Sequence, residues 1–126
     1  MRLLLDTHAL IWWVSGDERM RQRDLVGDDD IEVFASAVSA YEIALKYRLG
    51  KLASAERLAA AFETEIARQR IAELPLAAAH GRLAGRLEGN HRDPFDRMLV
   101  AQCLLEGLIL ISADAALDQF GVQRLW

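Results

Sequence analysis

Residues 3–9 of the chain read Leu3-Leu4-Leu5-Asp6-Thr7-His8-Ala9. The three leucines predict a short buried strand over residues 2–5, and the pattern after Asp6 predicts a helix over residues 7–15. The apolar residues 108–112 form a comparable run, and Asp114 follows that run closely. Sites in parallel sheets gather beyond the carboxyl ends of the strands. We therefore expect Asp6 and Asp114 at the same edge of a sheet.

The rest of the chain alternates between helical and extended patterns. Further helices are predicted over residues 18–26, from Ser36 or Ser39 to Leu49, and over residues 54–70, 77–87, 94–106 and 115–119. Extended segments are predicted over residues 31–35, 71–76, 108–112 and 122–126. Strands that are continuous apolar runs and alternate with helices indicate an α/β fold, with a parallel sheet covered on both faces.

Size and composition describe an ordinary folded protein. A chain of 126 residues, 52% hydrophobic and 27% charged, predicts one domain over residues 1–126 and excludes a disordered chain. The net charge of −4 is unlike the basic footprint of most nucleic-acid binders. Part of that negative charge is local if acidic side chains gather around metal ions.

Cysteine usage and hydropathy bear on the compartment. The single Cys103 excludes an internal disulfide and predicts a buried thiol, in keeping with a reducing cytoplasm. No apolar run approaches the roughly 18 residues that span a bilayer. We expect a cytoplasmic protein with no membrane partner.

Four acidic residues stand where predicted elements begin or end: Asp6, Glu42, Asp96 and Asp114. Carboxylates in one cleft repel each other and raise each other's pKa unless a cation neutralises them. Their hard oxygen atoms suit Mg²⁺ or Mn²⁺. The pattern favours a metal-dependent phosphoryl-transfer site, and a nuclease before other such enzymes.

Helix capping is the alternative explanation for these acids. Ser39 and Glu42 have the spacing of a capping box. Asp93 has the position of an N-cap before Pro94, with Asp96 third in the helix. Asp6 and Asp114 could cap the helices that follow their strands. Capping and catalysis are compatible, with Asp93 capping the helix while Asp96 faces a metal.

Basic side chains lie near the acids in sequence. Lys46 and Glu42, and Arg97 and Asp93, are spaced for i,i+4 pairs. The alternative for these cations is that they steer phosphates toward the acids. Candidates for positioning the acids or contacting substrate are Thr7, His8, Ser39, Asp93, Arg92, Arg97 and Ser112.

Four fragments together resemble the PIN-domain nucleases, in particular the VapC-like toxins of bacterial toxin–antitoxin modules. They are Leu3-Leu4-Leu5-Asp6-Thr7-His8-Ala9-Leu10-Ile11-Trp12, Ser36-x-x-Ser39-x-x-Glu42-Ile43, His91-Arg92-Asp93-Pro94-Phe95-Asp96-Arg97-Met98-Leu99 and Leu110-Ile111-Ser112-Ala113-Asp114. Each fragment is weak alone, but their order and spacing are specific, and the resemblance covers essentially the whole chain.

The resemblance implies a three-layer α/β/α sandwich with a central parallel sheet of four or five strands. It implies an acidic Mg²⁺ or Mn²⁺ pocket formed by Asp6, Glu42, Asp96 and Asp114, with Asp93 close by. It also implies an endoribonuclease that cleaves structured RNA such as tRNA or rRNA. The implied assembly is a homodimer inhibited by a small antitoxin whose tail occupies the groove.

Two other classes of function fit parts of the pattern, an enzyme or receiver that is phosphorylated on aspartate and a non-catalytic module. An aspartate-based phosphatase could use Asp6 as nucleophile, but the turn after Asp6 lacks the second acid at i+2 that haloacid-dehalogenase-type enzymes use. A phospho-acceptor receiver needs a late lysine, and no lysine follows Lys51. The remaining alternative is a non-catalytic PIN-like binding module whose acids only cap helices.

Overall fold

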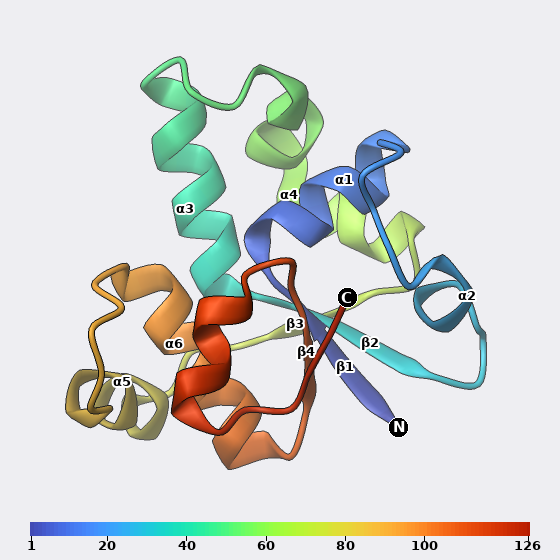
Figure 1. The fold of residues 1–126 in the computed structure, drawn as a ribbon. Coiled ribbons are helices and arrows are strands. Elements are labelled where there is room, and N and C mark those ends of the chain that lie inside the picture. The colour runs from blue at the N-terminus through green and yellow to red at the C-terminus, as the bar shows by residue number, and fades with distance from the viewer.

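The strands form one five-stranded parallel sheet in the computed structural model, which describes residues 1–126 (Figure 1). The order across the sheet is β3-β2-β1-β4-β5. The strands are β1 (Arg2–Leu5), β2 (Glu32–Ser36), β3 (Ala72–Leu74), β4 (Ile109–Ile111) and β5 (Arg124–Leu125). The prediction of a parallel sheet of four or five strands is confirmed, and the number is five.

Eight helical segments connect and cover the strands. They are α1 (Thr7–Ser15), α2 (Arg23–Val26), α3 (Ala37–Arg48), the 3₁₀ segment η1 (Ala53–Ala55), α4 (Glu56–Arg68), α5 (Ala78–Arg86), α6 (Pro94–Glu106) and the 3₁₀ segment η2 (Ala115–Phe120). No helix in the structure has both the length and the apolar character needed to cross a membrane.

The helix predicted over residues 18–26 is wrong in its first half, since only Arg23–Val26 is helical. Asp17 Oδ1 accepts a hydrogen bond from the Arg19 backbone N–H at 2.8 Å, a local turn that competes with a helix. Gln22 then adopts a left-handed conformation with φ 57°, which a continuous helix does not allow.

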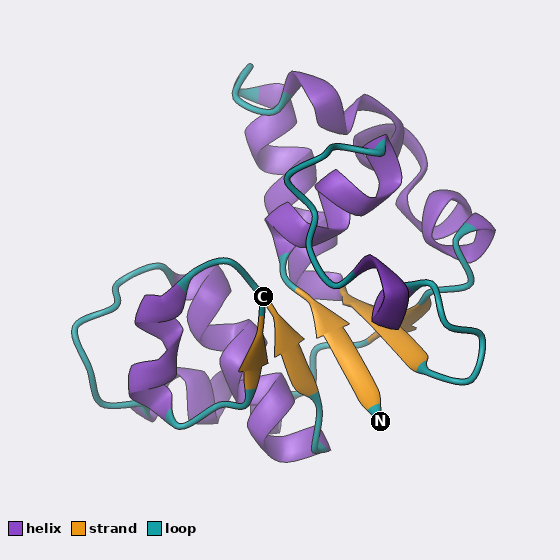
Figure 2. Cartoon of the chain, turned by 45° about the vertical axis from the view of Figure 1, so that its right-hand side comes forward, coloured by secondary structure: helices purple, strands orange, loops and turns teal.

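The sheet is covered by helices on both faces, as the purple and orange layers of Figure 2 show. Side chains alternate across a strand, so Leu3 and Leu5 pack into the larger core with α1, α3 and α4, while Leu4 packs into the smaller one with α6 and η2. All three leucines are fully buried. This arrangement is the predicted α/β/α sandwich, and it explains why β1 is a continuous apolar run.

The chain changes direction across the sheet beside β1. It passes from β1 to β2 and β3 on one side, then returns to place β4 and β5 on the other side. Leu5 is in register with Ile111, so β1 and β4 end at the same level. The Asp6 N–H donates to the Ile111 carbonyl at 3.0 Å. Such a switch point is where ligands bind in open α/β sheets, and Asp6 and Asp114 follow its two strands.

Candidate metal centre

Asp6 joins the end of β1 to the start of α1. Its Oδ1 accepts a hydrogen bond from the Ala9 N–H at 2.8 Å, so the predicted N-cap is confirmed. Only 7% of Asp6 is exposed. Burial raises the pKa of the Asp6 carboxyl above its usual value, and the charge of Glu42 raises it further, against hydrogen bonds from Ser112 and Ala9 and the charge of His8.

The helix that carries Glu42 begins one residue after β2. Ser36 is its N-cap, because the Ser36 hydroxyl accepts from the Val38 N–H at 2.9 Å while the Ser36 backbone is still extended. The capping box predicted for Ser39 and Glu42 is therefore wrong. Both residues lie inside α3, and both are buried on the side that faces α1.

Glu42 is held by two side chains, Thr7 of α1 and Lys46 of α3. The Thr7 hydroxyl donates to Glu42 Oε1 at 2.6 Å and lies 2.9 Å from the Ser39 hydroxyl. Lys46 forms the predicted i,i+4 ion pair with Glu42 Oε2. The carboxylate is thus 3% exposed yet hydrogen-bonded and charge-compensated, as a buried acid requires.

Lys46 also links Glu42 to the acids of α6. Burial lowers the pKa of the Lys46 ammonium, but the hydrogen bond and charge of Glu42, with the charges of Asp93 and Asp96, outweigh burial and raise that pKa overall. The ammonium therefore lies within the field of acids from α3 and from the start of α6.

The start of α6 carries two acids with different roles, because Asp93 caps the helix and Asp96 does not. Asp93 Oδ1 accepts from the N–H groups of Phe95 at 2.8 Å and Asp96 at 3.3 Å, which confirms Asp93 as the N-cap. Asp96 does not cap the helix, and its carboxylate faces His91. Burial raises the pKa of Asp96 to about 6, helped by the charges of Asp93 and Asp6 and opposed by His91.

His91 connects Asp96 to Asp114. Its Nε2 lies 2.9 Å from Asp96 Oδ2 and 3.9 Å from Asp114 Oδ2. Ligand atoms of these three residues all lie within 4.8 Å of one another. Sequence reasoning missed His91, although it stands only two residues before the N-cap of α6, where the loop turns back toward the sheet edge.

Asp114 is held in place by the end of β4. Its Oδ1 accepts from the Ala116 N–H at 3.0 Å and caps η2, as predicted, and its own N–H donates to the Ser112 hydroxyl at 3.1 Å. The Ser112 side chain also lowers the pKa of the Asp6 carboxyl, against the effect of burial. One buried serine therefore joins the acids that follow β1 and β4.

The arginines flanking Asp96 have different roles. Arg97 donates to the carbonyls of Ala84 at 3.1 Å, His91 at 2.9 Å and Leu87. The predicted pair of Arg97 with Asp93 is wrong, because the guanidinium holds the loop before α6 instead. Arg92 is exposed and forms no ion pair.

The family follows from the whole sequence. The sequence model of the PIN domain matches residues 3–123. The chain belongs to the PIN domain family. No curated protein sequence matches the chain significantly.

Solved structures share this PIN fold at low sequence identity. VapBC2 from Rickettsia felis, bound to a DNA fragment from its promoter, contains a chain that is 13% identical, with TM-score 0.72 and coverage of 99% of this chain and 98% of that one. FitAcB from Neisseria gonorrhoeae gives 20% identity, TM-score 0.67 and coverage of 100% and 97%. VapBC-1 from nontypeable Haemophilus influenzae gives 15%, 0.63, and 99% and 97%.

The chemistry of this PIN-domain centre fits a divalent cation. Two of its acids, Asp6 and Asp96, have raised pKa values because burial and neighbouring carboxylates disfavour their charged forms. A bound cation would relieve that penalty. Carboxylate oxygens of Asp96 and Asp114 lie close together, and the charge of Asp6 acts on Asp96. Carboxylate oxygens are the donors that Mg²⁺ and Mn²⁺ prefer.

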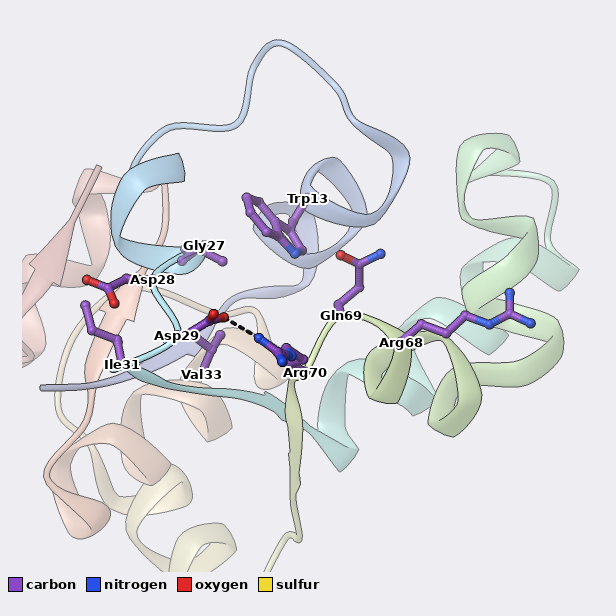
Figure 3. A pocket seen from close by; sticks show the side chains of 10 residues that line it. Trp13, Gly27, Asp28, Asp29, Ile31, Val33, Arg68, Gln69 and Arg70 are labelled. Atoms are coloured by element: carbon purple, nitrogen blue, oxygen red, sulfur yellow. Dashed lines mark hydrogen bonds and ion pairs between the residues drawn. The ribbon is translucent and has the colours of Figure 1, made fainter.

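Another pocket of the PIN domain lies away from these acids. It has a volume of about 590 Å³ and is lined by Trp13, the 27–31 turn and the end of α4, beside the amino ends of β2 and β3. Figure 3 shows the ion pair of Asp29 and Arg70 across it. None of the four sequence-predicted acids lines this pocket.

Proposed function

We propose that this PIN domain is a metal-dependent endoribonuclease and the toxin of a toxin–antitoxin module. The observation that carries the proposal is the cluster of Asp96, Asp114 and His91, whose ligand atoms lie within 4.8 Å of one another, with the charge of Asp6 acting on Asp96 and that of Glu42 acting on Asp6. Helix capping alone does not require acids from different elements to lie close enough to raise each other's pKa. Membership of a family composed largely of nucleases supports the same conclusion.

We assign each residue of the centre a role according to its position. Asp6, Asp96 and Asp114 would hold Mg²⁺ or Mn²⁺, with Glu42 completing the acidic pocket. When bound there, a divalent cation would lower the pKa of a water for in-line attack on a phosphodiester and would offset charge on the phosphate. Thr7 and Lys46 hold the Glu42 carboxylate in position.

Two further residues, Ser112 and His91, hold the acids of the same pocket in position. Ser112 orients Asp6 and Asp114 together. His91 Nε2 lies 2.9 Å from Asp96 Oδ2 and so holds that carboxylate in position. His8 is an exposed neighbour of Asp6 and remains a candidate contact to substrate, together with Arg92.

The proposed partners follow from the fold neighbours and the resemblance. VapBC2, FitAcB and VapBC-1 are described as two-component assemblies. We propose that this chain likewise acts in the cytoplasm as a homodimer and is inhibited by a small antitoxin whose tail enters the cleft. Structured RNA such as tRNA or rRNA is the proposed substrate.

RNA cleavage by the purified chain tests the nuclease proposal. With Mn²⁺ the wild type should cleave RNA, and EDTA should stop it. Asp96→Asn should reduce the rate by more than the roughly 10–100-fold usual for residues that only support a metal ligand. Asp29→Asn makes the same chemical change in the distant pocket and should cleave at the wild-type rate. Cleavage that persists in EDTA or in Asp96→Asn contradicts the proposal.

A further inference from the structure

A hollow of about 490 Å³ lies beside the acids at the carboxyl edge of the sheet. It is lined by Trp12, Glu18, Arg19, Arg21, Ala113 and Trp126. Its volume falls within the range of about 300–1,000 Å³ that is usual for small-ligand sites. No residue of this hollow belongs to the metal centre described above.

The walls of the hollow are aromatic and cationic. The rings of Trp12 and Trp126 lie 5.6 Å apart at an interplanar angle of 53°. The Arg19 guanidinium lies 4.9 Å from the Trp12 ring and is fixed by Asp17, whose Oδ2 is 2.8 Å away. Arg21 is exposed and forms no ion pair, whereas Glu18 is the one acid of the lining.

One wall of the hollow adjoins the metal centre along the chain. Ala113 stands between Ser112 and Asp114, so one wall is the backbone that carries an acid. On the other side, the His8 ring lies 5.8 Å from that of Trp12, one helical turn apart on α1. Six residues of helix separate Trp12 from Asp6, or about 9 Å along the axis. A nucleotide neighbouring a phosphodiester at the acids would reach this hollow.

We propose that the hollow binds an unpaired base of RNA next to the phosphodiester that the acids cleave, an inference that rests on the proposed function. Aromatic side chains stack on bases of any sequence, and arginines beside them contact the flanking phosphates. A base that is paired in a duplex does not expose its face for stacking.

Binding measured apart from cleavage tests the inference. The full chain is titrated in EDTA with a fluorescein-labelled single-stranded RNA, with the same RNA carrying one abasic nucleotide, and with its duplex. Trp126→Leu and Arg19→Ala remove stacking and a cation from the hollow. Tyr47→Leu and Arg70→Ala are matched controls on exposed residues outside both sites.

Trp126→Leu should weaken single-strand binding about tenfold, within the range found for base–aromatic contacts. The duplex affinity and the rise in melting temperature with Mn²⁺ should not change. An abasic nucleotide at one position should weaken binding to the wild type but not to Trp126→Leu, because both changes remove the same contact.

Two outcomes would overturn the inference, and a third would refute the nuclease proposal alone. If Trp126→Leu binds single-stranded RNA as tightly as Tyr47→Leu does, while the wild type still cleaves RNA with Mn²⁺, then only the assignment of the hollow is wrong. Loss of binding to a partner protein with RNA affinity retained would make the hollow a protein interface. The wild type could instead bind single-stranded RNA through Trp126 and never cleave it. That result would refute the nuclease proposal, whereas the assignment of the hollow as a base-binding site would be retained.

Discussion

Asp6 combines a structural and a proposed chemical role in one carboxyl group. Its Oδ1 caps α1, while the group as a whole shares a field with Glu42 and Asp96. Asparagine caps helices about as well as aspartate, and alanine does not. Asp6→Asn should therefore stop RNA cleavage and leave the cap intact, whereas Asp6→Ala should also lose about 1 kcal/mol of unfolding free energy.

Urea unfolding and a cleavage assay on the same preparations check this separation. The capping explanation predicts instead that Asp6→Asn cleaves like the wild type. An Asp6→Asn protein with full activity would leave Asp6 as a cap only and remove it from the metal centre.

Asp96 makes the metal-free protein sensitive to pH. Its pKa rises from 3.8 to about 6 on folding, so between these values the folded protein binds more protons than the unfolded chain. The contribution of Asp96 to stability therefore falls as pH rises through this window, and the loss is complete above it. In EDTA near pH 7, Asp96→Asn should be about 1 kcal/mol more stable than the wild type, after allowance for solvent screening.

Thermal melts of both proteins across this pH range measure the difference. The gain from Asp96→Asn should shrink toward pH 4 and should reverse when Mn²⁺ is added, because only the wild type keeps the full set of acids. An Asp96→Asn protein that is less stable than the wild type in EDTA at neutral pH would show that the carboxylate is not penalised by burial.

Among the structural elements, the loop between α5 and α6 depends on one guanidinium. Arg97 binds three carbonyls, those of Ala84, Leu87 and His91, and so fixes the loop that carries His91. Each hydrogen bond to a charged donor contributes about 1.5–3 kcal/mol at most, and partial hydration after removal reduces the cost. Arg97→Met should lower the unfolding free energy by about 2 kcal/mol and speed amide exchange over residues 87–92.

Arg92→Met is the matched control, because Arg92 is exposed and forms no ion pair. It should change stability by less than about 0.5 kcal/mol. Equal effects of the two substitutions in urea unfolding and hydrogen exchange would mean that the carbonyl contacts of Arg97 do not hold the loop.

At the scale of the whole molecule, sequence alone predicts the sheet and the edge where the acids lie. The reason is that Leu3–Leu5 and Leu108–Ile111 are apolar runs whose pattern predicts a buried strand without tertiary information, and parallel strands end together. Boundaries marked by strong caps, such as Asp93 and Pro94, were also predictable.

Features that depend on contacts between distant segments were not predictable. His91 joins the site only because Arg97 folds its loop back, and Ser39 faces Thr7 only because α3 packs beside α1. The choice between Ser36 and Ser39 as the cap depends on where β2 ends, which pairing with β1 and β3 determines. Likewise, the hydrogen bond from the Arg19 N–H to the Asp17 side chain forms a local turn in place of the first half of the helix predicted over residues 18–26.

We propose that acids from four elements together bind a divalent ion. The melting temperature as a function of Mn²⁺ concentration tests this binding most directly. At about 100 times the dissociation constant, binding to the folded state adds about 2.7 kcal/mol, which raises the midpoint by about 10 °C. The wild type and Asp29→Asn should show this rise and lose it in EDTA, and Asp96→Asn should show little of it. A wild-type midpoint that does not move, or an equal rise in Asp96→Asn, would contradict the account.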